Sequence, residues 1–191
     1  MRKIVLASAS PRRKELLSLT GLSYSIDAAD VHEDMDSTLP PRVLARRLSL
    51  QKARAVADRH KDALIIAADT FIAFRGHLLG KPRDEQDAKR MLGMLSGRSH
   101  SVITGFTIMD TATRKTVSRA VETKVWFRRL TRPEIAAYVK TGEPLGKAGA
   151  YAIQGRGSVI VRRIEGDYAN VVGLPVAEVT RCLKGFGIHI F

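Results

Sequence analysis

Apolar residues along this chain fall into two patterns that alternate from one end to the other. Short continuous apolar runs are typical of buried strands, whereas apolar positions spaced three and four apart are typical of helices with one buried face. In the first half these patterns predict strands at residues 3–7, 22–26 and 63–74 and helices at residues 11–19, 40–60 and 84–95. The RGH tripeptide at 75–77 predicts a hairpin turn after the third strand.

The second half continues the same interleaving of strands and helices. A DTATRK turn separates strand-like stretches at 102–109 and 117–127, and Thr131 with Glu134 forms a capping box for a short helix that ends near Gly142. Further along, the pattern predicts a strand at 158–164, a loop with the sequence EGDYANVVGLP, a helix at 175–184 and a terminal strand at Ile188. We find no internal repeat and no linker, so we expect one α/β domain over residues 1–191, built on a mixed sheet.

Composition narrows the class of protein. The chain has 191 residues, of which 45% are hydrophobic, enough to bury a substantial core. No apolar run approaches the roughly 20 residues that span a bilayer, and the apolar stretch at 4–7 is too short for a signal peptide. We therefore expect a cytosolic protein without a membrane partner. The single cysteine, Cys182, allows no internal disulfide, and its apolar setting predicts a packed thiol and not a nucleophile.

The charge balance predicts an anionic partner. Thirty-two Lys and Arg stand against 19 Asp and Glu, a net charge of +13. Nucleic acid, acidic lipid headgroups and a polyphosphate would each satisfy such a charge. The basic residues are spread along the chain and form no basic tail, which favours a pocket over a nucleic-acid-binding arm.

The stretch LASASPRRKELL at 6–17 places cations where a helix begins. Ser10 is the natural N-cap and Pro11 the first helical residue, so backbone N–H groups are left pointing at one spot next to Ser8. Such a helix start binds anions, whereas Arg12 and Arg13 oppose the helix dipole by a few tenths of a kcal/mol each. A bound phosphate would reverse the sign of that effect. The alternative is that both arginines are solvated surface residues.

Two charged residues lie at positions where apolar residues are expected. Lys52 falls inside the apolar stripe of the 40–60 helix, where its ammonium either extends to solvent or points into a phosphate pocket. Asp69 interrupts the run LIIAADTFIAF. A buried carboxylate needs a metal ion, a cation or an altered pKa nearby, unless it serves as a turn or N-cap residue.

Glu33, in the acidic loop at 28–37, is a second carboxylate that could share a metal ion with Asp69, although such a loop can equally be a solvated surface. The five histidines show no metal-ligand spacing, which argues against zinc. Oxygen ligands point to Mg²⁺ or Mn²⁺, held by one or two carboxylates and by phosphates of the substrate.

Two further positions carry candidate chemistry. Lys81 follows a glycine and precedes a proline, so its backbone is expected to be fixed in a turn that directs the side chain, unless it is an ordinary exposed lysine. Gln154 lies in the Gly-rich segment GKAGAYAIQGRG at 146–157, where backbone can approach a ligand closely and an amide can read the edge of a base. The segment matches neither a Walker A motif nor a Rossmann fingerprint.

Taken in order, several segments resemble the motifs of the Maf family of nucleotide pyrophosphatases. They are LASASPRRKELL at 6–17, AADT at 67–70, LLGKPRD at 78–84, AKRMLGMLSGRSHSVITG at 88–105, GKAGAYAIQG at 146–155 and GDYANVVGLP at 166–175. The resemblance covers nearly the whole chain. It implies a two-lobed α/β fold related to the inosine triphosphate pyrophosphatases, with a long mixed sheet, a central cleft and often a homodimer. The implied activity is hydrolysis of a nucleoside triphosphate to the monophosphate and pyrophosphate with a divalent cation.

The resemblance also implies roles for particular residues. The subgroup that acts on dTTP, UTP and modified pyrimidine triphosphates is matched here by Arg13, Thr70 and Gln154. The full implied set is catalytic Asp69, Lys52, Lys81 and Glu33, metal-binding Asp69 and Glu33, and substrate-binding Ser8, Arg12, Arg13, Thr70 and Gln154. Asp69 is the preferred candidate for activating water, and the resemblance leaves Glu33 able to do so. Two alternatives remain: a 7-methyl-GTP pyrophosphatase of the same family, and a non-enzymatic protein that binds nucleic acid or regulates division.

Overall fold

A computed structural model of the chain describes residues 2–28, 31, 35 and 38–191. These residues divide into two compact units, each formed by several segments. The first unit contains Met1–Asp69, Thr104–Val121 and Gly173–Phe191, and the second contains Thr70–Ile103 and Glu122–Val172. Three long strands, β3 (Ala63–Phe74), β5 (Ser99–Asp110) and β6 (Thr116–Phe127), contribute residues to both units.

The described strands belong to one mixed sheet with the order β2-β1-β3-β5-β6-β7, and β4 pairs with β3. The shorter strands are β1 (Lys3–Leu6), β2 (Ser25–Ile26), β4 (His77–Leu79) and β7 (Val161–Glu165). β1 runs parallel to both β2 and β3, whereas β4 and β7 pair antiparallel with β3 and β6. This arrangement confirms the predicted α/β class with a mixed sheet.

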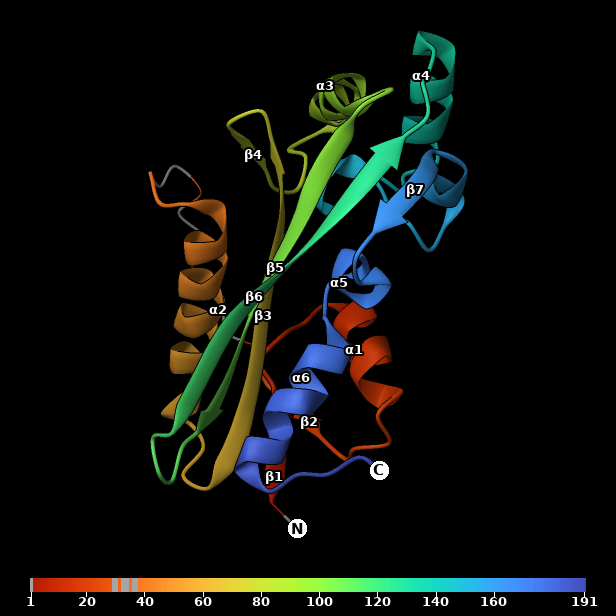
Figure 1. The fold of residues 1–191 in the computed structure, drawn as a ribbon. Helices are drawn as coiled ribbons and strands as arrows, with labels where there is room; N and C mark the ends of the chain where they lie inside the picture. Colours follow the sequence, from red (N-terminus) through yellow and green to blue (C-terminus); the bar gives the residue numbers. More distant parts are fainter. Residues whose placement is uncertain (1, 29–30, 32–34, 36–37) are drawn as a thin grey trace. The chain divides into compact units, whose positions relative to one another are not determined.

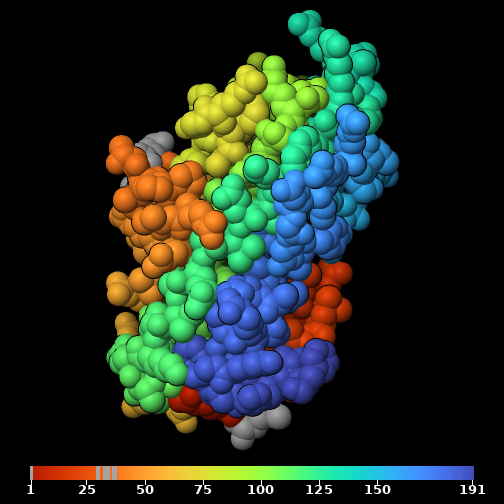
Figure 2. All heavy atoms as spheres, viewed as in Figure 1, coloured from red at the N-terminus to blue at the C-terminus, as the bar shows by residue number. Residues whose placement is uncertain are grey.

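In the first unit, helices cover both faces of the sheet. α2 (Pro41–Ala57) lies on one side of β1 and β3, and α1 (Pro11–Ser18) and α6 (Val176–Leu183) lie on the other (Figure 1). The buried positions of α2 recur at helical spacing and pack on alternate residues of the strands, as expected for an amphipathic helix on a sheet. The opposite side of α2, orange in Figure 2, forms part of the molecular surface.

The second unit has its own core. Many residues of this core come from β3, β5 and β6, from α3 (Glu85–Leu95) and from α4 (Arg132–Lys140), and others come from β4, the Gly-rich segment and the chain that follows it. α3 and α4 contact each other, and α3 also contacts the 3₁₀ turn Ala148–Ala150. The predicted capping box of α4 is present, because Thr131 accepts a hydrogen bond from the Glu134 N–H while Glu134 accepts one from the Thr131 N–H. None of the helices in the described part of the chain is long and apolar enough to cross a bilayer.

Near the C-terminus, one predicted strand begins later than expected and two further predictions were wrong. Residues Arg156–Val159 form a 3₁₀ helix, and the strand begins only at Val161. The predicted loop contains the helix α5 (Tyr168–Val172), because the Asp167 carboxylate accepts a hydrogen bond from the Asn170 N–H, 3.1 Å away, and caps the turn. Ile188 lies in no strand. Its N–H donates to the Leu183 carbonyl across Gly187, which has a φ of +77° and closes the end of α6.

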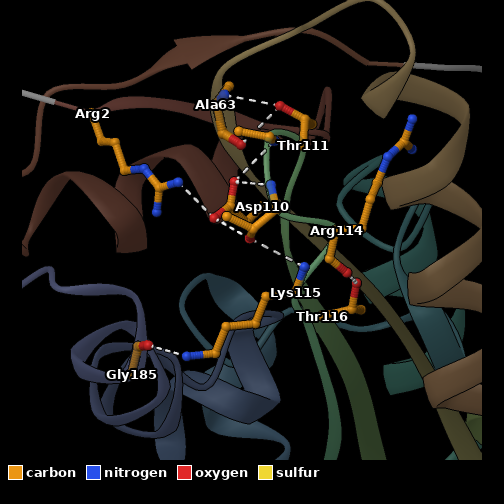
Figure 3. A network of polar contacts seen from close by, with 10 residues as sticks. Arg2, Ala63, Asp110, Thr111, Arg114, Lys115, Thr116 and Gly185 are labelled. Atoms are coloured by element: carbon orange, nitrogen blue, oxygen red, sulfur yellow. Dashed lines mark hydrogen bonds and ion pairs between the residues drawn. The ribbon is translucent and has the colours of Figure 1, made fainter.

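A polar network closes the β5–β6 turn of the first unit (Figure 3). The buried Asp110 carboxylate accepts hydrogen bonds from Arg2 Nη2 and from Thr113 Oγ1, each at 2.6 Å. The backbone N–H of Ala112 donates to the same carboxylate at 3.0 Å. Burial alone would raise the pKa of Asp110, but these donors outweigh burial and lower the pKa to about 2.

This lowered pKa predicts a pH-dependent stability. Because the folded pKa of Asp110 lies below its ordinary value of 3.8, the carboxylate stabilises the fold above about pH 4, and this contribution is lost as the pH falls toward 2. We expect Asp110→Asn to lower the free energy of unfolding by about 1–3 kcal/mol at pH 7 and by progressively less between pH 4 and pH 2. Urea denaturation over this pH range measures the difference. Asp62→Asn removes an exposed carboxylate and serves as the control; an equal loss at every pH would contradict the assignment.

Candidate functional site

The turn between β1 and α1 holds an arginine in a defined orientation. Ser10 occupies the N-cap position and Pro11 begins the helix, as predicted. Arg13 is half-buried and donates from Nε to the Gly173 carbonyl at 2.9 Å and from Nη1 to Ser8 Oγ at 3.2 Å. The Ser10 N–H also donates to Ser8 Oγ, at 3.3 Å. Arg13 is therefore not a freely solvated surface residue.

Arg12 is half-buried in the same first turn of α1. No acidic residue lies in that turn, so both guanidinium groups add to the positive end of the helix dipole. A helix start with this charge suits an anionic ligand such as a phosphate group.

Lys52 and Asp69 form an ion pair in the interior of the first unit. Lys52 donates from Nζ to Asp69 Oδ1, and the two side chains are 15% and 4% exposed. α2 packs on the face of β3 that carries Asp69, so the ammonium reaches the carboxylate instead of extending into solvent. Among the partners that the sequence left open for Asp69, the structure shows a cation, Lys52.

The Asp69 carboxylate has the chemistry that a divalent cation selects. Oδ1 accepts the hydrogen bond from Lys52, and the carboxylate is 4% exposed. Carboxylate oxygens are the preferred protein ligands of Mg²⁺ and Mn²⁺. Within the described ranges, no group of three or more acidic, histidine or cysteine residues forms a metal site. Glu33, predicted as the second carboxylate, lies outside the described residues.

In the second unit, two segments that the sequence singled out lie together. The Gly149 N–H donates to the Gly80 carbonyl at 2.9 Å, which joins the Gly-rich segment to the turn that carries Lys81. Lys81 is exposed on this turn and its neighbour Pro82 is buried. Gly149 has a φ of +66°, and a Cβ there would lie 2.1 Å from Ile72 Cδ1. Only glycine therefore allows the segment to approach the β3 core so closely.

The middle of the Gly-rich segment is fixed by an aromatic anchor. Tyr151 is buried, stacks edge-on against Phe127 and His100, and lies with its Oη 2.9 Å from His100 Nε2. Burial lowers the pKa of His100 to about 3 and raises that of Tyr151, so both groups are neutral at physiological pH.

The two residues that the sequence predicts to bind the base differ in exposure. Thr70, which directly follows Asp69, is half-buried, and Gln154 is exposed three residues beyond Tyr151.

The sequence does not single out Glu143, whose carboxylate holds the Gly-rich segment at 146–157. Its carboxylate accepts hydrogen bonds from Tyr138 Oη at 2.7 Å and from the N–H groups of Gly157 and Arg156 at 2.8 and 2.9 Å. Glu143 follows Gly142, the glycine just after α4. A polar residue at this position is typical of an ordinary surface turn. No local pattern indicated its role, because the two backbone N–H groups that it accepts from lie 13 and 14 residues further along the chain.

Comparisons with solved structures identify the fold of this chain, and comparisons with protein sequences identify its family. A HAM1 protein from Coxiella burnetii superposes with a TM-score of 0.57 at 15% identity, over 97% of this chain and 100% of that one. The Staphylococcus aureus Ham1 protein gives a TM-score of 0.53 at 14% identity, with the same coverage of both chains. This chain therefore has the fold of the Ham1 proteins.

Residues 3–186 match the family described as Maf-like protein. The dTTP/UTP pyrophosphatase of Bacillus cereus strain AH820 is 48% identical over 190 residues, which cover 100% of this chain and 98% of that protein. The dTTP/UTP pyrophosphatase of Bacillus anthracis strain CDC 684 / NRRL 3495 is 47% identical with the same coverage. This chain belongs to the Maf family, as its motifs indicate.

Proposed function

We propose that this protein hydrolyses dTTP, UTP and modified pyrimidine nucleoside triphosphates to the monophosphate and pyrophosphate, a house-cleaning activity on nucleotides. The observation that carries the proposal is the identity of 48% over the whole chain to a relative named dTTP/UTP pyrophosphatase. The site chemistry supports it, since a held arginine at a helix start and a buried carboxylate–ammonium pair suit hydrolysis of a phosphoanhydride bond.

In the proposed reaction, the cations Arg12, Arg13, Lys52 and Lys81 bind the triphosphate and neutralise charge that develops as the bridge between the α and β phosphates breaks. Because Arg13 is held by Ser8 and Gly173, little reorganisation is needed when the anion binds. Preorganised charge of this kind accounts for most of the acceleration in phosphoryl-type transfers.

The Asp69 carboxylate orients a water molecule and accepts its proton as the water oxygen attacks the α-phosphorus. The bond from the α-phosphorus to the bridging oxygen breaks, and pyrophosphate leaves with the electron pair of that bond. Glu33 is the alternative base. A divalent cation, Mg²⁺ or Mn²⁺, would be held by Asp69, with Glu33 as a second ligand, and when bound it supplies positive charge that polarises phosphate oxygens.

Thr70 and Gln154 read the pyrimidine in this proposal. Both have hydroxyl or amide groups that can donate to and accept from a base edge. Gln154 is exposed on a segment whose backbone is fixed on both sides, which supports a recognition role. The expected homodimer, the expected cleft between two lobes and a cytosolic location stay predictions.

Pyrophosphate release tests the proposal. We expect the purified protein with Mn²⁺ to convert dTTP and UTP with values of kcat/KM at least about tenfold above that for 7-methyl-GTP, because a pocket that hydrogen-bonds one base leaves its polar groups unpaired on another. A preference for 7-methyl-GTP would assign the chain to the other substrate class. Binding to DNA with a steep salt dependence, without turnover of any nucleotide, would replace the enzymatic proposal with nucleic-acid binding.

A further inference from the structure

The backbone on both sides of Gln154 is held by one pair of side chains. Before Gln154, the N–H of Ala152 donates to Tyr138 Oη at 3.2 Å. After Gln154, the N–H groups of Arg156 and Gly157 donate to the two oxygens of the Glu143 carboxylate, at 2.9 and 2.8 Å. The side chains that hold these two stretches of backbone are themselves joined, because Tyr138 Oη donates to Glu143 Oε1 at 2.7 Å.

This clamp, defined here as Tyr138 and Glu143, requires a carboxylate. An ionised carboxylate offers only acceptors, and here it receives three donors from two separate segments. Burial would raise the pKa of Glu143, but the hydrogen bonds from Tyr138, Gly157 and Arg156 lower it below its ordinary value. The group is thus charged at neutral pH and anchored at both oxygens.

The glycines around Gln154 fit the clamp closely. A Cβ at Gly155 would lie 2.2 Å from Glu143 Oε2, so any side chain at this position would displace the carboxylate from its donors. A Cβ at Gly157 would lie 2.5 Å from the Ala152 carbonyl and 2.6 Å from Tyr138 Oη. The sequence QGRG therefore brings the backbone against the clamp on the side that follows Gln154.

From this geometry we infer that Glu143 and Tyr138 are positioning residues that set the place of Gln154 and thereby the choice of base. The inference rests on the proposed function, in which Gln154 reads the pyrimidine. The hydrogen bonds of the clamp go to the backbone on both sides of Gln154, so we assign the clamp to base selection and not to the chemical step. A shift of Gln154 by about 1 Å is enough to lose an oriented hydrogen bond.

Glu143→Gln tests the inference with little change in shape. The amide retains one acceptor oxygen, but its NH₂ group faces a donor where the carboxylate oxygen accepted one. We expect KM for dTTP to rise on the order of tenfold with kcat within about threefold, and the ratio of kcat/KM for dTTP over 7-methyl-GTP to fall by on the order of tenfold. Gly155→Ala, which reaches the clamp from the opposite side, is expected to lower the same ratio.

The control variant is Glu134→Gln in the same unit. Glu134 also accepts backbone and side-chain hydrogen bonds, from Thr131 and Arg128, but it holds only the start of α4. It is expected to lower thermal stability without changing the substrate ratio. Amide hydrogen exchange across residues 152–157 provides a second readout, which Glu143→Gln is expected to accelerate and Glu134→Gln is not.

The outcomes separate the two proposals. If the parent protein converts dTTP and Glu143→Gln leaves the substrate ratio unchanged while its amide exchange accelerates, the positioning role is wrong and the proposed function stands. If Glu134→Gln lowers the ratio as much as Glu143→Gln does, the effect is general loosening of the unit and the inference is again wrong. If the parent protein converts no nucleotide, the proposed function fails, and the inference fails with it.

Discussion

Asp69→Asn is expected to lower kcat for dTTP by about 1,000-fold while leaving the protein folded. Asparagine has nearly the same shape and retains an oxygen that accepts the hydrogen bond from Lys52, so the packing of α2 on β3 is preserved. It carries no negative charge and is a very weak base, so it neither takes a proton from water nor holds a divalent cation well. Removing a catalytic acid–base group typically costs 10²–10⁴ in rate. Single-turnover kinetics with circular dichroism measure both effects.

The matched control for Asp69→Asn is Asp110→Asn. Asp110 is also a buried carboxylate of the first unit, 2% exposed and paired with a basic residue, Arg2. Asp110→Asn is expected to lower stability and to leave kcat unchanged, because Asp110 lies in the β5–β6 turn network and has no proposed contact with substrate. Turnover by Asp69→Asn within about threefold of the parent would remove Asp69 from the reaction and leave Glu33 as the candidate base.

Most elements of the fold could be predicted because their signals are local. The strand at 63–74 is an apolar run, interrupted at Asp69 and Thr70, that has the same limits in the structure, and the capping box at Thr131 depends on residues three positions apart. The errors occur where a distant partner decides the local conformation. Gly157, directly before the predicted strand at 158–164, donates its N–H to the Glu143 carboxylate. Asn170 in α5 donates to Val102 of β5 and to Thr123 of β6.

The residues of the candidate site likewise include some that local sequence predicts and some that depend on distant contacts. Lys52 and Asp69 could be predicted because each is a charged residue within an apolar pattern, and burial requires a charge to be paired. The pattern left open whether the partner of Asp69 was a metal ion or a cation, since the position of α2 on β3 is a tertiary property. Arg13 was recognisable from its place at a helix start, but its contact with Gly173 joins residues 160 positions apart. The same reason hides the clamp at Glu143.

Gly105→Ala is expected to cause the largest loss of stability, about 3 kcal/mol or more, with a fall in Tm of about 10 °C. Gly105 lies in β5 directly beneath α2, where an added Cβ would lie 1.9 Å from the Ala45 carbonyl oxygen and 2.8 Å from the Arg46 nitrogen. Both contacts are backbone atoms inside a helix, so no side-chain rotation relieves them, and α2 must move away from the sheet. Differential scanning calorimetry and urea denaturation measure the loss.

The same displacement should reach the site, because α2 also carries Lys52. Gly105→Ala is therefore expected to lower turnover of dTTP even at temperatures where the variant is folded, since the ammonium moves relative to Asp69. Gly93→Ala in α3 is the matched control: this exposed helical glycine has open space around its Cβ position, so the same added methyl should raise stability by about 0.5–1 kcal/mol. A Tm for Gly105→Ala within about 2 °C of the parent would mean that α2 does not approach β5 so closely in solution, and the ion pair between Lys52 and Asp69 would lose its structural basis.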